Sequence, residues 1–558
     1  MRRDVALVTA LLAPLLVAPL WSPPIGEHGE AREGLVVQHI VAHGEWILPR
    51  RNGELPSKPP LFHWLAAPLG HVFGVSDATL RLPSAVAAAV LATTTFALGA
   101  GMGGPPAGWL ALGALLTMHD FWWSASEARV DMVFAVCCTL SLAGFWVWYG
   151  GGRRAGAARA LCYLGAACAV LAKGPVGLVL PALVIAVFLV WQRDLRALAR
   201  LWSWPLAATV VLIDGGWYAL AIRAGGRDFV AVQLLHENVD RFLGRHRFAS
   251  AAADPGFRHF RFRMPIEFAR HFFPANLAVL WAVRCALRGE RMDTAARFLH
   301  AWWITVLAFF TLAVGKRSVY LLPLAPAVAL VAGRALAAID LRSPRRRIVA
   351  AAAIVAADLV VLMAVQVTRA YHARRHSLDD FARDVGRIVP ANAVLYAAPD
   401  LGPPALLVVA YRLERTIGRV PAACTPDAFV LARPGHARVA EAIAFLRWNL
   451  TWSGGAGSCA PMRRRTIRAA GALLMVALLS VLVAARAHTH RDLRSARSCA
   501  TCVATEHAPV AGVAPVATVP ASVAAVVLAG IASVVPAPPA RTPRTGRAPP
   551  PADCAPVG

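Results

Sequence analysis

Long runs of Ala, Val and Leu recur roughly every 25–40 residues along the chain, the pattern of a protein that crosses a membrane many times. Of the 558 residues, 58% are hydrophobic and only 16% are charged, against about a quarter in ordinary soluble proteins. We therefore expect a polytopic α-helical membrane protein. An ordinary soluble enzyme is excluded.

The apolar runs predict about 11 membrane spans. The first run follows Arg2 and Arg3 and has no clear cleavage site, so we expect an uncleaved helix rather than a signal peptide. The predicted spans lie at residues 5–21, 80–99, 105–119, 130–150, 158–172, 174–191, 203–222, 271–287, 297–315, 319–338 and 348–367.

The net charge of +26 comes largely from arginine clusters between the spans. The clusters at 153–154, 193–196, 288–291 and 342–347 all fall on one side if the first span begins in the cytoplasm. Since basic connectors stay in the cytoplasm, the charge indicates orientation, and we exclude nucleic-acid binding. The opposite loops, predicted to face the periplasm, are 22–79, 120–129, 172–174, 223–270, 315–319 and the segment after 367.

Lysine is rare in this chain. Among 57 basic residues only Lys58, Lys173 and Lys316 are lysines, and all three fall in the predicted outward loops. An ammonium is a compact point charge, whereas a guanidinium is a broad planar fork. A lysine retained in such an arginine-rich chain is therefore a candidate for a specific role, with chance survival as the alternative.

Three regions are predicted. Residues 1–370 form the main membrane domain, and two apolar stripes in the loop 22–79 predict helices lying in the membrane interface. Residues 371–455 form a small outward α/β domain, with a helix at 377–389 and strands at 393–397 and 428–431. Residues 456–558 form an appended tail with one or two apolar spans and a Pro-rich end; its HxH and CxxC motifs are weak metal signals.

Charged residues gather in the outward loops. Lysine and arginine can hold a phosphate, and a carboxylate can take a proton from an attacking hydroxyl. Such a set suits an anionic, lipid-anchored substrate. For Arg32 and Arg81 the alternative is contact with the membrane interface; for Glu237 and Arg241 it is a surface ion pair, and for Asp131 a helix cap. The candidate residues are Glu30, Arg32, Lys58, Arg81, Asp131, Lys173, Glu237, Arg241, Lys316 and Tyr320.

The order of these motifs resembles the GT-C superfamily of polyprenyl-phosphate-sugar glycosyltransferases. The resemblance is to glycosyltransferase family 39, which includes bacterial aminoarabinose transferases and protein O-mannosyltransferases, and it covers residues 1–370. Its motifs are an acidic-x-Arg site after the first helix, Gly44-Glu45-Trp46-Ile47-Leu48-Pro49, Lys58-Pro59-Pro60, Arg81-Leu82-Pro83, Lys173-Gly174-Pro175 and Lys316-x-x-x-Tyr320-x-x-Pro323.

The resemblance implies an inverting transferase in the bacterial inner membrane. It would move a sugar from a polyprenyl-phosphate donor to a periplasmic-face acceptor, which could be a glycolipid, a protein or a polysaccharide. The family's first-loop motif is Asp-Glu-x-Arg, and this chain has Gly29-Glu30-Ala31-Arg32. We therefore predict Glu30 as a catalytic carboxylate, with Glu27 as its alternative, and Asp131 as the second. Lys58 matches the family's phosphate-contacting lysine.

No cofactor follows from the sequence. Ser57 stands where aminoarabinose transferases have an acidic residue linked to metal binding, so a divalent metal stays open. Two other functions are also open. Asp214 and Asp358, in or near apolar spans, favour a lipid or sugar transporter or flippase. Gly29 favours an inactive relative that binds polyprenyl phosphate without turnover.

Overall fold

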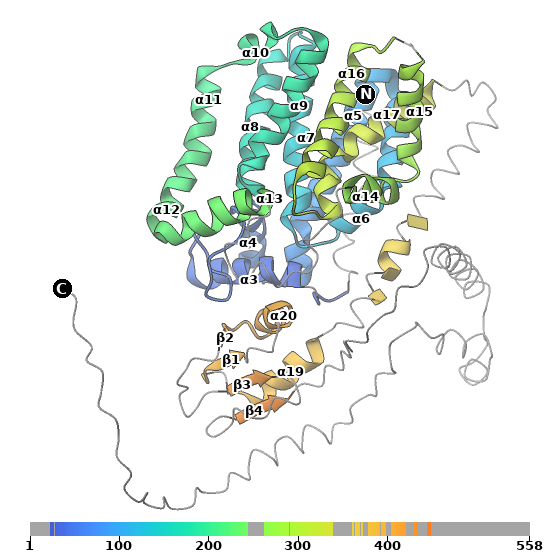
Figure 1. Ribbon diagram of the computed structural model, residues 1–558. Helices are drawn as coiled ribbons and strands as arrows, with labels where there is room; N and C mark the ends of the chain where they lie inside the picture. The colour runs from blue at the N-terminus through green and yellow to red at the C-terminus, as the bar shows by residue number, and fades with distance from the viewer. Residues whose placement is uncertain are drawn as a thin grey trace, which may run out of the picture. The chain divides into compact units, whose positions relative to one another are not determined.

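The computed structural model is mostly helical (Figure 1). The chain divides into two compact units, Met1–Phe429 and Val430–Gly558, and every residue discussed below as part of a site belongs to the first. The structure describes residues 23–26, 28–243, 262–288, 291–338, 360–361, 363–368, 370–371, 378–390, 392–397, 403–419, 429–432 and 444–447.

Long helices joined by short ones make up most of the first unit. Two segments, η1 and η2, are π-helical, and η5 is a 3₁₀ helix. The elements are α3 (His28–His43), α4 (Leu61–Phe73), α5 (Asp77–Leu116), α6 (His119–Ala125), α7 (Val130–Tyr149), α8 (Ala155–Lys173), α9 (Val176–Gln192), α10 (Arg196–Leu201), α11 (Trp204–Val210), η1 (Val211–Gly215), α12 (Gly216–Phe229), η2 (Val230–Asp240), α13 (Arg241–Leu243), α14 (Arg263–His271), α15 (Ala275–Leu287), α16 (Thr294–Leu312), η5 (Ser318–Leu324), α17 (Ala325–Ala337), α19 (Asp379–Ile388), β1 (Leu395–Ala397), α20 (Pro403–Leu413), β2 (Gly418–Arg419), β3 (Phe429–Ala432) and β4 (Ala444–Arg447).

Six helical segments of the described chain are long and apolar enough to cross a membrane. Shorter apolar helices add to them, among them α9. The protein is therefore a multi-pass membrane protein, although the predicted count of about 11 spans is not confirmed. The predicted first span and the tail 456–558 lie outside the described residues. The six segments are 77–116, 130–149, 155–173, 204–240, 294–312 and 318–337.

Helix α5 contains the predicted span 80–99 and most of the predicted span 105–119. Between them Gly104 has φ 81° and ψ 169°, a backbone conformation that only glycine adopts without strain. The rings of Phe96 and Trp109 lie 5.0 Å apart, so the two halves of α5 pack against each other. The chain thereby returns to the end at which α5 begins, and α6 and the start of α7 lie at that same end.

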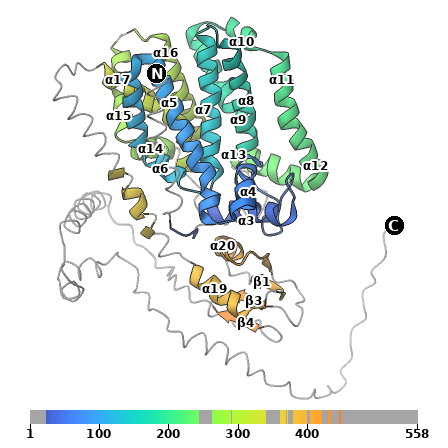
Figure 2. The same ribbon diagram turned by 180° about the vertical axis from the view of Figure 1, so that it is seen from behind.

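Helices α7 and α8 approach each other through small residues. A Cβ atom added to Gly165 of α8 would lie 2.6 Å from the backbone N of Ser141 in α7, and one added to Gly144 would lie 2.5 Å from the N of Cys162. The Ser141 hydroxyl donates a hydrogen bond of 2.8 Å to the Cys162 carbonyl. This is the close backbone packing that small residues permit between membrane helices, and Figure 2 shows α7 and α8 running side by side.

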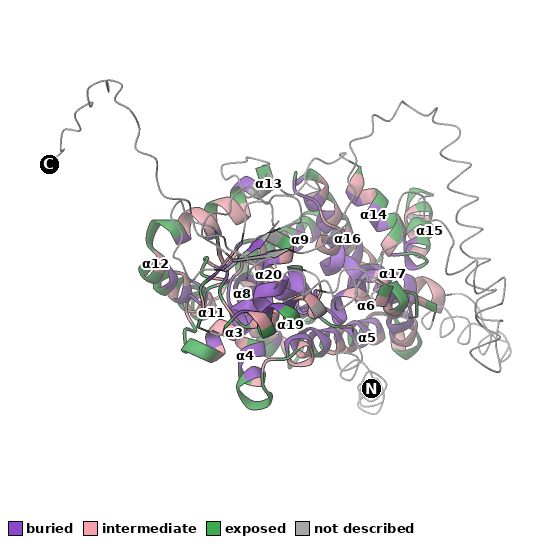
Figure 3. Cartoon of the chain, turned by 90° about the horizontal axis from the view of Figure 1, so that it is seen from below, coloured by how far each residue is buried: buried purple, intermediate pink, exposed green. Residues whose placement is uncertain are grey.

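Aromatic rings join three helices near the end of α7. Phe145 of α7, Phe188 of α9 and Phe298 of α16 have ring centroids 5.4–5.9 Å apart, and all three side chains are fully buried. We call this group the aromatic clamp. Unlike the three helices that carry these buried rings, α12 has mostly exposed residues, as Figure 3 shows.

The two apolar stripes of the first outward loop form helices α3 and α4, as predicted. Helix α3 buries Leu35, Val36 and Ile40. Helix α4 leaves Val72 and Phe73 more than two thirds exposed, as would suit a helix end that meets lipid head groups.

The predicted helix at 377–389 and the strand at 393–397 correspond to α19 and β1, and β3 corresponds to the strand predicted at 428–431. Strand β1 pairs in parallel with β2, with Tyr396 opposite Gly418. Helix α20 packs on α3, and Arg412 of α20 forms an ion pair of 3.0 Å with Asp77. The boundaries predicted for the small domain stay a prediction.

The packing of α7 on α8 gives a stability test within one helix. We expect Gly165→Ala to lower the free energy of unfolding by about 1–3 kcal/mol, because its new methyl meets backbone. Gly156→Ala, where nothing lies within 4 Å, should raise it by roughly 0.5–1 kcal/mol. Thermal unfolding of both variants in detergent checks this, and equal effects would contradict the packing.

Candidate active site

A cavity of about 420 Å³ lies where several of the predicted outward loops meet. Four of the predicted site residues line it: Lys58 before α4, Lys173 at the end of α8, Glu237 on η2 and Tyr320 in η5. They come from positions far apart in the sequence, so the fold brings together loops that the charge pattern had placed on the same side of the membrane.

Lys58 lines this cavity, and its positive charge is paired with the carboxylate of Glu237. Its Nζ donates a hydrogen bond of 2.7 Å to Glu237 Oε2, and both side chains are about nine-tenths buried. Pro59 and Pro60 follow Lys58 and restrict the backbone, because a proline ring fixes φ. The ammonium is thus presented from a stiff segment and oriented by a carboxylate.

Lys173 is held from three sides. Its Nζ donates a hydrogen bond of 2.5 Å to Asp131 Oδ1 and lies 4.6 Å from the centre of the Tyr320 ring and 4.9 Å from that of Phe134. Asp131 also pairs with Arg129, at 3.4 Å between Oδ2 and Nε. The ring faces add cation–π attraction to the ion pair, which fixes the ammonium at the cavity wall.

The rest of the wall is largely apolar. Val176 and Val179 of α9 and Phe309 and Phe310 of α16 line it, together with Phe242. A pocket with a few charged groups among apolar side chains suits an amphiphilic ligand. Here the two ammonium groups would select an anionic head group.

Glu30 forms a buried ion pair with Arg81, in which two guanidinium N–H groups bond to the two carboxylate oxygens; we call this pair the buried fork. The Arg81 Nε and Nη2 atoms donate hydrogen bonds of 2.7 and 2.8 Å to the two carboxylate oxygens, and the backbone N–H of Ala128 donates another of 2.8 Å. Arg81 Nη1 donates to the Pro23 carbonyl. Both side chains are almost fully buried and neither lines the cavity. Their predicted catalytic and substrate-binding roles stay predictions, and Glu27 lies outside the described residues.

Arg32 contacts Glu33, a carboxylate that was not among the predicted site residues. Its Nη2 lies 2.5 Å from Glu33 Oε1, and His63 Nε2 lies 2.9 Å from Glu33 Oε2. Burial raises the pKa of Glu33, but the Arg32 charge and the His63 contact outweigh burial and hold the pKa below its usual range. Arg32 does not line the cavity, and its predicted role stays a prediction.

Two further predicted residues lie close to the cavity in sequence. Lys316 is buried and stands between the lining residue Gly315 and Arg317. Arg241 begins α13, next to the lining residue Phe242, but its side chain lies outside the description. Asn238, which was not predicted, lines the cavity, and its Oδ1 would lie 3.0 Å from a Cβ added at Gly174. The sequence signal for Asn238 as a site residue was its position directly after the predicted site residue Glu237.

Gly29, at the position of the Asp in the family's Asp-Glu-x-Arg motif, faces a cation. A Cβ added to Gly29 would lie 2.7 Å from Arg129 Nη1. Arg129 also pairs with Asp131, so position 29 and Asp131 share one guanidinium. An Asp at position 29, as in the family motif, would therefore belong to the same charged group as Arg129 and Asp131.

The metal implied by the resemblance does not fit the residues near Ser57. In the described part of the chain, donor atoms of three His, Cys, Asp or Glu residues come close enough to hold a metal ion only at His119, Asp120 and His271. Ser57 itself offers a neutral hydroxyl in place of a carboxylate. We assign no reaction step to a metal at Ser57.

Known proteins share both sequence and fold with this chain. The model of the dolichyl-phosphate-mannose-protein mannosyltransferase family matches residues 57–214. An undecaprenyl phosphate-α-4-amino-4-deoxy-L-arabinose arabinosyl transferase of Pseudomonas fluorescens is 30% identical over 358 residues, 61% of this chain and 58% of that protein. A Pseudomonas savastanoi transferase with the same substrate name is 31% identical over 60% of this chain and 61% of its own length. The chain thus matches less than two thirds of either relative.

Solved structures agree with the sequence matches. The crystal structure of ArnT from Cupriavidus metallidurans bound to undecaprenyl phosphate has a TM-score of 0.63, with 18% identity over 77% of this chain and 86% of that one. The chain has the GT-C glycosyltransferase fold. The archaeal oligosaccharyltransferase AglB from Archaeoglobus fulgidus matches with a TM-score of 0.51 and 14% identity over 75% of this chain and 65% of that one. The GT-C resemblance of the sequence is confirmed.

The buried fork in this GT-C fold gives a second test. Glu30→Gln leaves the Arg81 charge buried without its partner, which we expect to lower the free energy of unfolding by about 3–5 kcal/mol. Glu54→Gln removes one partner of the exposed pair between Arg51 and Glu54, and should cost less than about 1 kcal/mol. Thermal unfolding in detergent measures both.

The double variant Glu30→Leu with Arg81→Met should be more stable than Glu30→Gln alone, because it leaves no unpaired charge. If Glu30→Gln were as stable as Glu54→Gln, the fork would not be a structural element.

Proposed function

We propose that this protein is a membrane glycosyltransferase that moves a sugar from a polyprenyl-phosphate donor to an acceptor hydroxyl, with inversion at the sugar. One observation carries the proposal. Lys58 and Lys173 stand at one cavity whose remaining walls are largely apolar, which matches a phosphate attached to a lipid. The names of the relatives, undecaprenyl phosphate-aminoarabinose arabinosyl transferases, and the ArnT structure bound to undecaprenyl phosphate support this donor class.

In the proposed reaction the acceptor oxygen attacks the anomeric carbon from the face opposite the phosphate. A new carbon–oxygen bond forms, the bond to the phosphate oxygen breaks, and a carboxylate takes the acceptor proton. Negative charge on the leaving phosphate grows during this step. Lys58 and Lys173 stabilise that charge from fixed positions, so little reorganisation is needed during the reaction.

Asp131 is the base that the geometry favours. Neither carboxylate lines the cavity, but Asp131 bonds directly to Lys173, which does, whereas Glu30 bonds to Arg81 and the backbone N–H of Ala128, which do not. We assign Glu30 a positioning role: it fixes the segment 127–131 through Ala128. The donor phosphate would share Lys173 with Asp131, and this sharing would leave the carboxylate beside the reacting sugar.

The arginine-rich connectors indicate that the cavity opens to the periplasmic face of the inner membrane. A lipid-anchored donor reaches the cavity from within the membrane, and the acceptor approaches from the periplasm. Glycolipids, proteins and polysaccharides are the acceptor classes. Mass spectrometry of envelope glycolipids and glycoproteins, with and without the gene, identifies which of them carries the sugar.

Lys58 tests the phosphate site. We expect Lys58→Ala to lower turnover by about 10²-fold or more, the scale of one lost charge-stabilising contact. Lys58→Arg should be intermediate, because it keeps the charge but changes shape and hydration. Sugar transfer from a polyprenyl-phosphate donor by the purified protein is the measurement.

Arg51→Ala is the matched control, since it removes a cation of the same loop that does not line the cavity. Full activity of Lys58→Ala would overturn the phosphate site. Binding of the donor without turnover by the wild type would indicate an inactive relative, and movement of the lipid without covalent change would indicate a flippase.

Moving the carboxylate from position 131 to position 29 tests whether Asp131 is the base. Asp131→Asn should lower turnover by about 10²–10⁴-fold, as expected for loss of a general base. Adding Gly29→Asp should restore part of it, because the new side chain meets the flexible end of Arg129, which can shift and pair with the new carboxylate. Gly29→Asn in the same background is the control for size without charge. If Asp131→Asn were fully active, Glu30 would be the next candidate.

A further inference from the structure

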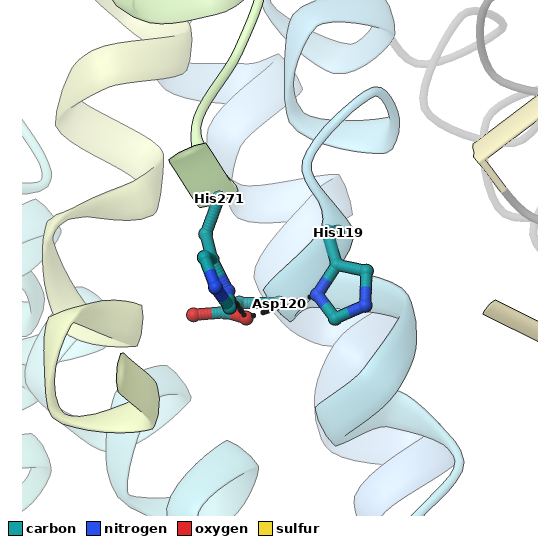
Figure 4. A group of neighbouring side chains, drawn as sticks. All are labelled: His119, Asp120 and His271. Atoms are coloured by element: carbon teal, nitrogen blue, oxygen red, sulfur yellow. Dashed lines mark hydrogen bonds and ion pairs between the residues drawn. The ribbon is translucent and has the colours of Figure 1, made fainter. Parts of the chain in front are cut away.

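A second group of ionisable side chains lies outside the cavity, where α6 meets α14. The Nδ1 atom of His271 in α14 contacts Asp120 Oδ1, and His119 Nδ1 lies 3.2 Å from the same oxygen. One ligand atom from each of the three residues can be chosen so that all lie within 4.8 Å of one another. Figure 4 shows both imidazoles against the Asp120 carboxylate. The cavity wall includes none of the three.

These contacts do not satisfy both oxygens of the Asp120 carboxylate. The residue is 4% exposed, and its Oδ2 atom is buried with no hydrogen-bond partner in the described structure. A buried carboxylate oxygen without a partner is costly, because it has lost its contact with water. The Asp120 oxygen can recover that loss by binding a cation.

His271 has the surroundings of a metal ligand. Its Nδ1 faces Asp120, and its Nε2 lies 3.0 Å from Glu267 Oε2 one helical turn earlier. A histidine that binds a metal through one ring nitrogen commonly donates its other N–H to a carboxylate, which fixes the ring and raises its basicity. Glu267 is placed to do this.

We propose that His119, Asp120 and His271 bind one divalent transition-metal ion, with Zn²⁺ as the best fit. Two imidazoles and a carboxylate are a common set of three protein ligands for Zn²⁺ and leave a fourth position for water. Mg²⁺ and Ca²⁺ prefer sites made of oxygen atoms, so the two imidazoles disfavour them.

The ion would act on structure. It would join α6, between α5 and α7, to α14, more than 130 residues later in the chain. Both helices contact η5, which carries the cavity residue Tyr320. A metal bridge between α6 and α14 would therefore support that wall of the cavity from behind.

Metal content of the full chain tests the site. The purified protein is stripped with a chelator and dialysed against a low concentration of Zn²⁺, and bound zinc per chain is measured by mass spectrometry. We expect one bound ion more in the wild type than in His119→Ala/His271→Ala. His119→Ala alone should bind zinc at least tenfold more weakly. Its side chain is 39% exposed, so its loss should leave the fold intact.

The control is His488→Ala/His490→Ala, which removes two imidazoles from the HxH motif of the tail. It should keep the ion that the cluster variant loses. Zinc should also raise the unfolding temperature of the wild type and of the tail variant, but not that of the cluster variant. Equal zinc content in the wild type and the cluster variant, or loss of zinc only in the tail variant, would overturn the proposal.

Discussion

The fork between Arg81 and Glu30 is the interaction on which the charged end of the bundle depends. A guanidinium buried this deeply in a membrane protein requires a partner, because the cost of desolvating the charge is several kcal/mol. Glu30 supplies it from α3 and also accepts a hydrogen bond from Ala128. One ion pair therefore connects the first outward loop, the start of α5 and the segment that leads into α7. The positions of Arg129 and Asp131 follow from that connection.

The same rule governs the cavity. Lys58 and Lys173 are each paired with a carboxylate, Glu237 and Asp131, so neither ammonium is left as an uncompensated buried charge. An anionic ligand would meet cations whose directions are already fixed, and it would need only to share them. The carboxylates thus stabilise the two buried ammonium groups and limit the attraction for anions that lack further contacts. Discrimination would then depend on the apolar wall, which suits the lipid part of a lipid-linked anion.

The sequence predicted the helical class, the helices of the first outward loop and several charged residues that meet at one cavity. Apolar periodicity and the placement of rare lysines carry that information because they depend on local composition. The pairing of charges could not be predicted, since the contacts of Glu30 with Arg81 and of Lys58 with Glu237 join positions 51 and 179 residues apart. Nor could the cluster of Asp120 with His271 be found, because its members are 151 residues apart and share no spacing motif.

The aromatic clamp has a mechanical consequence. Phe145 lies near the end of α7, Phe188 near the end of α9 and Phe298 near the start of α16, so the rings fasten these helices far from the cavity. On α16 the distance from Phe298 to the cavity residue Phe309 is eleven residues, about 16 Å at the rise of an α-helix. Helices α9 and α16 each carry one of these rings and also line the cavity, so the packing of the rings sets the spacing of the two helices along the cavity wall.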